Sequence, residues 1–186
     1  MNCTRCTARG CRNAVPCGAE EDIHHYVLDR YREPEEQNIV RAAAELVDNG
    51  RAGMLNRLEE IGEFAAAVGY KSLGVAYCFA MEEDAGLVAN YLKKRGFSVS
   101  SVSCTVGGME QSSINSASSI EAVSCNPIFQ AEQLNREGVD LVITMGLCLG
   151  HDILFNKYIK ADQTTLVVKD RTTGHNPLAA VRALRE

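Results

Sequence analysis

The sequence predicts an α/β fold, in which helices cover both faces of a doubly wound, mainly parallel sheet in three layers. From residue 71 onwards, short apolar runs alternate with segments of helical periodicity, as is typical of parallel sheets. The 186 residues suffice for one such domain with a small addition. The composition, 46% hydrophobic and 23% charged, is that of a globular protein. We therefore expect a Rossmann-like or flavodoxin-like arrangement with an N-terminal extension.

Three helices are expected before the first strand. Residues 20–33, 35–48 and 52–68 place apolar side chains at helical spacing, and Pro34 separates the first helix from the second. The predicted organisation is a four-cysteine metal-binding knot at residues 1–19, a helical lead-in packed on the sheet at 20–70, and the α/β domain at 71–186.

Four strands are expected in the α/β domain, at residues 72–79, 97–103, 139–145 and 164–169. Helices are expected at residues 82–95, 126–137, 152–159 and from 176 onwards. Asn126, Asp152 and Asn176 are placed to cap the last three of these helices. Residues 105–124 are rich in serine and glycine, and a loop this long in a compact domain is usually functional or mobile.

The eight cysteines fall into two sets of four. The first set, Cys3, Cys6, Cys11 and Cys17, has the spacing C-x2-C-x4-C-x5-C. Four thiolates this close in sequence can enclose one Zn2+ ion or one [4Fe-4S] cluster. So small a segment has too few apolar residues to fold without a metal, so we expect a metal centre here. Four unligated cysteines are the alternative, and the spacing fits zinc and a cluster alike.

The second set is Cys78, Cys104, Cys125 and Cys148. Cys78 lies at the end of the first predicted strand, and the others follow predicted strands or precede predicted helices. The carboxyl ends of parallel strands share one edge of a sheet, where α/β proteins bind their ligands. We therefore expect these thiols to line one edge. Cys125 lies just before a predicted helix, whose amino end favours a thiolate.

Other polar residues are expected at the same edge: His151, Asp152, Lys169, Asp170, Arg171, His175 and Asn176. Three chemistries fit this set. The thiols could hold a second metal or cluster tuned by the histidines, form a redox dithiol, or supply a nucleophile, for which the candidates are Cys125, Cys148, His151 and His175. The alternative for any one cysteine is burial as a small apolar residue.

Charge and composition limit the classes of partner that we expect the protein to bind. The net charge of −5 and the pI of about 5.4 disfavour general nucleic-acid binding. No apolar stretch is long enough for a membrane span, and the start lacks a signal sequence, so a cytoplasmic location and reduced thiols are expected. The partners that fit are a redox protein or a small anionic ligand.

Several long segments resemble a known family. They are SLGVAYCFAMEEDA (72–85), CNPIFQAEQLN (125–135), MGLCLGHDILFNKY (145–158) and TTLVVKDRTTGHNPLAAV (164–181). These segments, with the cysteine-rich start and the GLCxGHD and KDRxxxHNP motifs, are similar to bacterial and archaeal proteins of unknown function that are described as metal-binding proteins. The resemblance implies metal binding by the N-terminal cysteines and a functional sheet edge, but it implies no reaction.

The hypothesis from sequence is therefore a metal-binding protein, with iron–sulfur or zinc, that has a redox or electron-transfer role at a thiol-lined edge. Two alternatives remain open. One is a zinc-stabilised module that binds a small ligand or a partner, and the other is a thiol-dependent enzyme.

Overall fold

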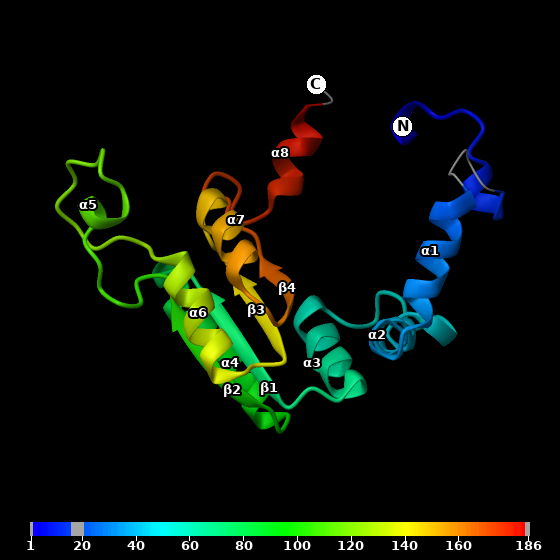
Figure 1. The fold of residues 1–186 in the computed structure, drawn as a ribbon, viewed down its shortest axis with the longest axis horizontal. Helices are drawn as coiled ribbons and strands as arrows, with labels where there is room; N and C mark the ends of the chain where they lie inside the picture. Colours follow the sequence, from blue (N-terminus) through cyan, green and yellow to red (C-terminus); the bar gives the residue numbers. More distant parts are fainter. Residues whose placement is uncertain (1, 16–20, 185–186) are drawn as a thin grey trace. The chain divides into compact units, whose positions relative to one another are not determined.

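The computed structural model describes residues 2–15 and 21–184 of the chain. It divides into two compact units, Met1–Glu45 and Leu46–Glu186 (Figure 1). The α/β sheet lies entirely within the second unit.

The first unit contains two helices, α1 (Glu21–Arg32) and α2 (Pro34–Glu45), close to the expected positions. They are preceded by two short 3-10 turns, η1 (Cys3–Arg5) and η2 (Gly10–Asn13). Pro34 is the first residue of α2, where its missing N–H costs nothing. Among the side chains described in this unit, only Ala42 is buried, so the described part of the unit has very little hydrophobic core.

The second unit is built on four parallel strands, β1 (Ser72–Tyr77), β2 (Ser98–Ser103), β3 (Leu141–Met145) and β4 (Asp162–Val167). Their order in the sheet is β2-β1-β3-β4. Because the chain moves from β1 outwards to β2 and then returns to β3, the sheet is wound in both directions from β1. The doubly wound α/β fold is therefore confirmed, with its topological switch point between β1 and β3.

Helices cover both faces of this sheet. On one face, α3 (Arg57–Val68) and α4 (Glu82–Lys94) contribute Ile61, Ala65, Val88 and Leu92 to the core. On the other, α6 (Pro127–Glu137) and α7 (Leu149–Tyr158) contribute Ala131, Leu134 and Phe155. Figure 1 shows α6 in front of the strands. Residues 73–77 and 141–145 of the central strands are all buried, as expected for strands covered on both faces.

Two helix starts differ from expectation. The third helix begins at Arg57 rather than at residue 52, because Asn56 forms a capping box with Glu59. The helix after β3 begins at Leu149, so Cys148 is the N-cap residue and Asp152 lies in the first turn instead of capping it. The expectation for Asp152 was wrong because the sheet ends at Met145 and the chain turns into the helix at once.

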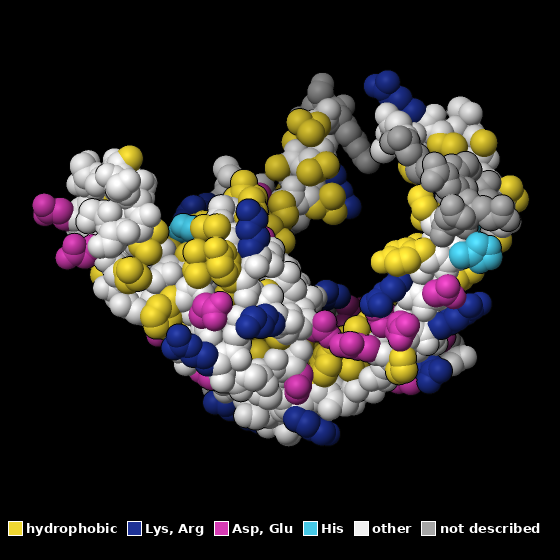
Figure 2. Space-filling model, viewed as in Figure 1, with side chains coloured by type: hydrophobic (Ala, Val, Ile, Leu, Met, Phe, Trp, Pro, Cys, Tyr) yellow, Lys and Arg dark blue, Asp and Glu magenta, His cyan; other side chains and the backbone are white. Residues whose placement is uncertain are grey.

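The ends of the second unit are exposed. The last helix, α8 (Pro177–Ala183), has exposed hydrophobic side chains at Leu178 and Val181, with Leu184 just after it, and Figure 2 shows hydrophobic side chains uncovered on this helix. Within residues 2–15 and 21–184, no helix is long and apolar enough to cross a membrane.

Candidate thiol site

Three of the four body cysteines lie in a row along the carboxyl edge of the sheet. Cys104 follows β2, Cys78 follows β1, and Cys148 lies three residues after β3. The backbone N–H of Cys78 donates to Met145 O at 3.0 Å, and that of Cys104 donates to Tyr77 O at 2.9 Å, so both residues continue the hydrogen bonding of the sheet. The expected thiol-lined edge is therefore present.

The fourth cysteine, Cys125, joins this row next to Cys104. The two sulfur atoms are 3.5 Å apart. Cys104 is 2% exposed, whereas Cys125 is half-buried. The backbone N–H of Asn126 donates to Cys104 O at 2.6 Å, which fixes the start of α6 against the end of β2. The pair therefore consists of one buried thiol and one thiol that solvent reaches.

The surroundings of Cys104 favour its neutral form. Burial raises the pKa of this thiol from 9.0 to about 12, and its neighbours Cys125 and Cys78 act in the same direction. The N–H of Phe79 donates to Cys104 Sγ at 3.3 Å and offsets part of this effect. Cys104 therefore has to lose its proton during any reaction in which it becomes a nucleophile.

The other two edge cysteines contact cations instead of thiols. Lys169 Nζ donates to Cys78 Sγ at 3.3 Å, and Arg171 Nη2 donates to Cys148 Sγ at 3.6 Å. Both cations belong to the turn after β4, which ends at Val167. The turn therefore reaches back across the ends of the two central strands.

His151 and Asp152 lie in the first turn of α7, both half-buried. Burial lowers the pKa of His151 and raises the pKa of Asp152, so burial favours the uncharged form of each side chain. A neutral imidazole can accept a proton, but in the part of the chain that the structure describes no hydrogen bond joins His151 to a thiol.

Asp170 and His175 hold the turn after β4 together. Asp170 Oδ1 accepts from the backbone N–H groups of Thr172 and Thr173 at 3.0 and 3.1 Å, and hydrogen bonds from Thr173 and Thr172 lower the pKa of this carboxyl. His175 Nδ1 accepts from the N–H of Asp170 at 3.1 Å. The ring is thereby tied to the backbone of the turn.

The two Asn-Pro helix starts differ. Asn126 Oδ1 accepts from Phe129 N at 3.1 Å and caps α6 as expected. Asn176 occupies the N-cap position of α8 without a side-chain capping bond, so the expectation that its side chain caps this helix was wrong. His175 precedes it with a φ of 67°, so the chain enters this helix from a left-handed residue.

The segment between Cys104 and Cys125 is a loop with little regular structure. It contains the single-turn helix α5 (Gln111–Ile114) and an antiparallel bridge between Glu110 and Val123. Asn126 Nδ2 donates to Met109 Sδ at 3.0 Å, so the loop is also attached to the start of α6. Cys104 and Cys125 thus stand at the two ends of the loop.

The first unit contains the N-terminal cysteines. Cys3 and Cys11 are exposed and Cys6 is half-buried, while Cys17 lies outside the described residues. Cys6 Sγ accepts from the N–H of Arg9 at 3.4 Å. Within residues 2–15 and 21–184, no three His, Cys, Asp or Glu side chains are grouped so that they could hold a metal ion. Metal binding by this segment stays a prediction.

Sequence reasoning missed Gln130. This residue of α6 is fully buried, and its Nε2 donates to Tyr77 O at 3.1 Å and to Val102 O at 2.7 Å, just below the thiol edge. Its Oε1 is buried without a hydrogen-bond partner among the described residues. One sequence signal could have identified it: Gln130 is a polar residue on the same buried face of α6 as the apolar residues Ala131 and Leu134.

Comparison with known proteins identifies a family whose function is unknown. Residues 15–166 match the family model described as "Protein of unknown function (DUF1847)". The chain is 40% identical over 186 residues to the uncharacterised protein MJ0455 of Methanocaldococcus jannaschii, with 97% of this chain and 93% of that protein covered. No solved structure matches the chain.

Proposed function

Because the chain belongs to the DUF1847 family of unknown function, we propose its activity from the chemistry of its own thiols. The proposal is a redox role in which Cys104 and Cys125 alternate between a dithiol and a disulfide. The observation that carries it is the 3.5 Å distance between the two sulfurs, one buried and one half-buried. A disulfide needs an S–S distance of about 2.05 Å, so a small movement of Cys125 would close the bond.

The reaction is a thiol–disulfide exchange. The thiolate of Cys125 attacks one sulfur of a small or protein disulfide, whose S–S bond breaks and releases one thiol after protonation. Cys104 then loses its proton and attacks Cys125 Sγ, which breaks the mixed disulfide and releases the second thiol. Two electrons thus pass from the protein dithiol to the substrate disulfide.

The surroundings of the pair support this order of attack. Cys125 is the member that solvent reaches, and it lies at the amino end of α6, which favours negative charge. Cys104 has a raised pKa because it is buried, so its deprotonation would limit the second step near neutral pH. We expect the rate of that step to increase with pH.

The test is oxidation of the reduced protein with a linear low-molecular-weight disulfide, oxidised glutathione, followed by peptide mapping. We expect the Cys104–Cys125 disulfide to form first. In Cys125→Ser this product should disappear, whereas Cys148→Ser is the matched control that should retain it. A first disulfide that involves Cys78 or Cys148, or a mixed disulfide on Cys125 that never resolves, would contradict the proposal.

A second part of the proposal concerns the N-terminal cysteines, which we infer to hold a metal. Supporting this, no residue between 2 and 15 is buried, so hydrophobic packing does not stabilise the described part of this segment. Cys3, Cys6, Cys11 and Cys17 are the thiolates that would bind. A [4Fe-4S] cluster there would supply one-electron transfer, whereas Zn2+ would be structural.

Metal and sulfide analysis of protein purified without oxygen tests this part, with the variant Cys3→Ser/Cys6→Ser as comparison. About four irons and four sulfides per chain that disappear in the variant would support a cluster. About one zinc per chain that disappears in the variant would support a zinc site. Metal that the variant retains, or no metal in either protein, would refute binding by these cysteines.

A further inference from the structure

Two cations converge on the switch point of the sheet. Lys169 reaches Cys78 at the end of β1, and Arg171 reaches Cys148 at the start of α7, with N–S distances of 3.3 and 3.6 Å. These thiols follow the two strands between which the direction of winding reverses. In open α/β sheets, ligands bind in the crevice at this point.

The charges of the two cations are not neutralised by acids. In the part of the chain that the structure describes, neither Lys169 nor Arg171 forms an ion pair. The carboxylate between them in sequence, Asp170, is occupied by the backbone N–H groups of its own turn. Both cations are therefore without a direct ion pair among the described residues, and the Asp170 carboxylate between them bonds to the backbone of its own turn.

The position of Gly146 shows how close Lys169 lies to the end of β3. Gly146 is buried with a φ of 63°, and a Cβ atom there would lie 2.2 Å from Met81 Sδ and 3.8 Å from Lys169 Nζ. The Lys169 ammonium thus lies close to the backbone at the end of β3 and also contacts Cys78 beyond β1. It therefore lies near the ends of both strands.

The amino end of α7 faces the same edge. This helix of ten residues begins directly after Cys148, and no side chain caps its first N–H groups in the described structure. Uncapped N–H groups at a helix start favour anions. They lie next to the thiol that Arg171 contacts, so the helix start and the cation act together.

We infer that this edge binds a small oxyanion of the phosphate class, held by Lys169, Arg171 and the first turn of α7. The site takes either a free anion or the phosphate group of a nucleotide. Binding depends on the cations and the helix start. It therefore goes beyond the dithiol exchange and does not require it.

Alkylation of Cys148 provides the test, because this half-buried thiol lies beside the inferred site. Reduced protein is treated with anionic iodoacetate or neutral iodoacetamide, and the rate at Cys148 is followed by peptide mass spectrometry. We expect the iodoacetate-to-iodoacetamide rate ratio at Cys148 to exceed that of N-acetylcysteine by about tenfold, since a cationic crevice concentrates anions.

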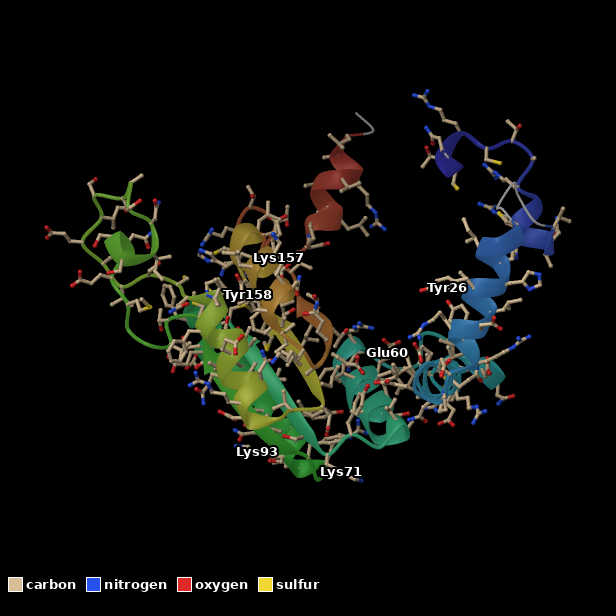
Figure 3. All side chains as sticks on the ribbon, viewed as in Figure 1. Tyr26, Glu60, Lys71, Lys93, Lys157 and Tyr158 are labelled. Carbon is tan, nitrogen blue, oxygen red and sulfur yellow. The ribbon has the colours of Figure 1, made fainter. Side chains whose placement is uncertain are left out.

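Variants and competitors identify the source of the effect. Lys169→Gln and Arg171→Gln should each lower the ratio towards that of N-acetylcysteine. Lys157→Gln is the matched control, because this exposed lysine lies in the last turn of α7 (labelled in Figure 3) and should leave the ratio unchanged. Inorganic phosphate should slow iodoacetate more than chloride of equal ionic strength does.

The outcomes separate the ligand sources and the two proposals. Equal competition by phosphate and adenosine monophosphate indicates a free anion, whereas stronger competition by the nucleotide indicates its phosphate group. A raised ratio in Cys104→Ser/Cys125→Ser shows that the site is independent of the dithiol. A wild-type ratio equal to that of N-acetylcysteine, or phosphate no better than chloride, would overturn the inference.

Discussion

Burial changes the chemistry of individual side chains along the sheet edge. Cys104 is enclosed by the cluster that includes Ala131 and Leu134, which keeps its thiol protonated. His151 and Asp152 are only half-buried, yet burial shifts both towards their neutral forms. Lys169 contacts a thiol. The edge therefore combines side chains whose burial favours their uncharged forms with two cations that form no ion pair among the described residues.

The raised pKa of Cys104 predicts a loss of stability at alkaline pH. The unfolded thiol ionises near 9.0 and the folded thiol near 12, so between these values the folded chain keeps a proton that the unfolded chain has lost. The stabilisation is complete below pH 9 and decreases as the pH rises, by about 1.4 kcal/mol per pH unit at most. Urea unfolding under reducing conditions at about pH 8 and about pH 10 measures this.

The matched variant for this measurement is Cys104→Ala. It lacks the titrating thiol, so its free energy of unfolding should fall less than that of the wild type over the same interval. Equal losses in the two proteins would show that the Cys104 thiol does not titrate differently in the folded and unfolded states.

The surroundings of Gly146 predict that the addition of one methyl group at this position lowers the free energy of unfolding. Gly146→Ala would place a Cβ 2.2 Å from Met81 Sδ and strain a residue whose φ is 63°. We expect a loss of about 2–4 kcal/mol in the free energy of unfolding. Gly150→Ala is the control: its Cβ meets nothing within 4 Å in α7, and a gain of about 0.5–1 kcal/mol is expected. A neutral Gly146→Ala variant would rule out this close approach.

At the scale of elements, α6 connects the two central features of the site. Its N-cap Asn126 is bonded to Cys104 through the backbone, and Gln130, one turn later, is bonded to the carbonyls of Tyr77 and Val102. Tyr77 is the last residue of β1, and Val102 is the last but one of β2. The helix therefore fixes the ends of both strands that precede Cys78 and Cys104.

This connection predicts that Gln130→Met lowers the free energy of unfolding. The variant keeps the side-chain length but removes the two hydrogen bonds that the Gln130 amide donates to Tyr77 O and Val102 O. We expect a loss of about 1–3 kcal/mol in the free energy of unfolding, measured by urea denaturation. Gln133→Met on the same helix loses only a contact with Glu137, so a change within about 0.5 kcal/mol is expected. Equal effects of the two substitutions would contradict this role of Gln130.

At the scale of the whole molecule, the two units differ in what stabilises them. The second unit has two hydrophobic clusters, one on each face of its sheet. Among the side chains described in the first unit, only Ala42 is buried. The first unit therefore depends on something other than a hydrophobic core, which the proposed metal would supply.

Removal of this metal predicts a response confined to the first unit. After treatment with a chelator, amide hydrogen exchange should accelerate at residues 2–15 and stay unchanged in the sheet of the second unit, because the sheet has its own core. The variant Cys3→Ser/Cys6→Ser should already exchange fast and should not respond to the chelator. Equal acceleration in both units, or none at residues 2–15, would contradict the proposed role of the metal.

The sequence by itself determined the fold class and the edge on which the body cysteines lie. Periodicity marked each strand, and in a parallel sheet every strand ends at the same edge, so Cys78, Cys104 and Cys148 were assigned to it without knowledge of the strand order. Local capping signals were less reliable. Asn126 caps its helix as expected, but Asp152 does not, because an N-cap preference is weak compared with the packing that sets where a strand ends.

Only the tertiary structure decided which residues meet. The packing of the elements places Cys104 next to Cys125. Cys78 contacts Lys169, 91 residues away in sequence, and Cys148 contacts Arg171, 23 residues away. The same packing gives Gln130 its backbone partners and gives Cys104 its raised pKa. Periodicity reports which face of an element is buried. Contacts between distant segments and the desolvation of a single thiol depend on how the elements pack together, and no local pattern encodes that.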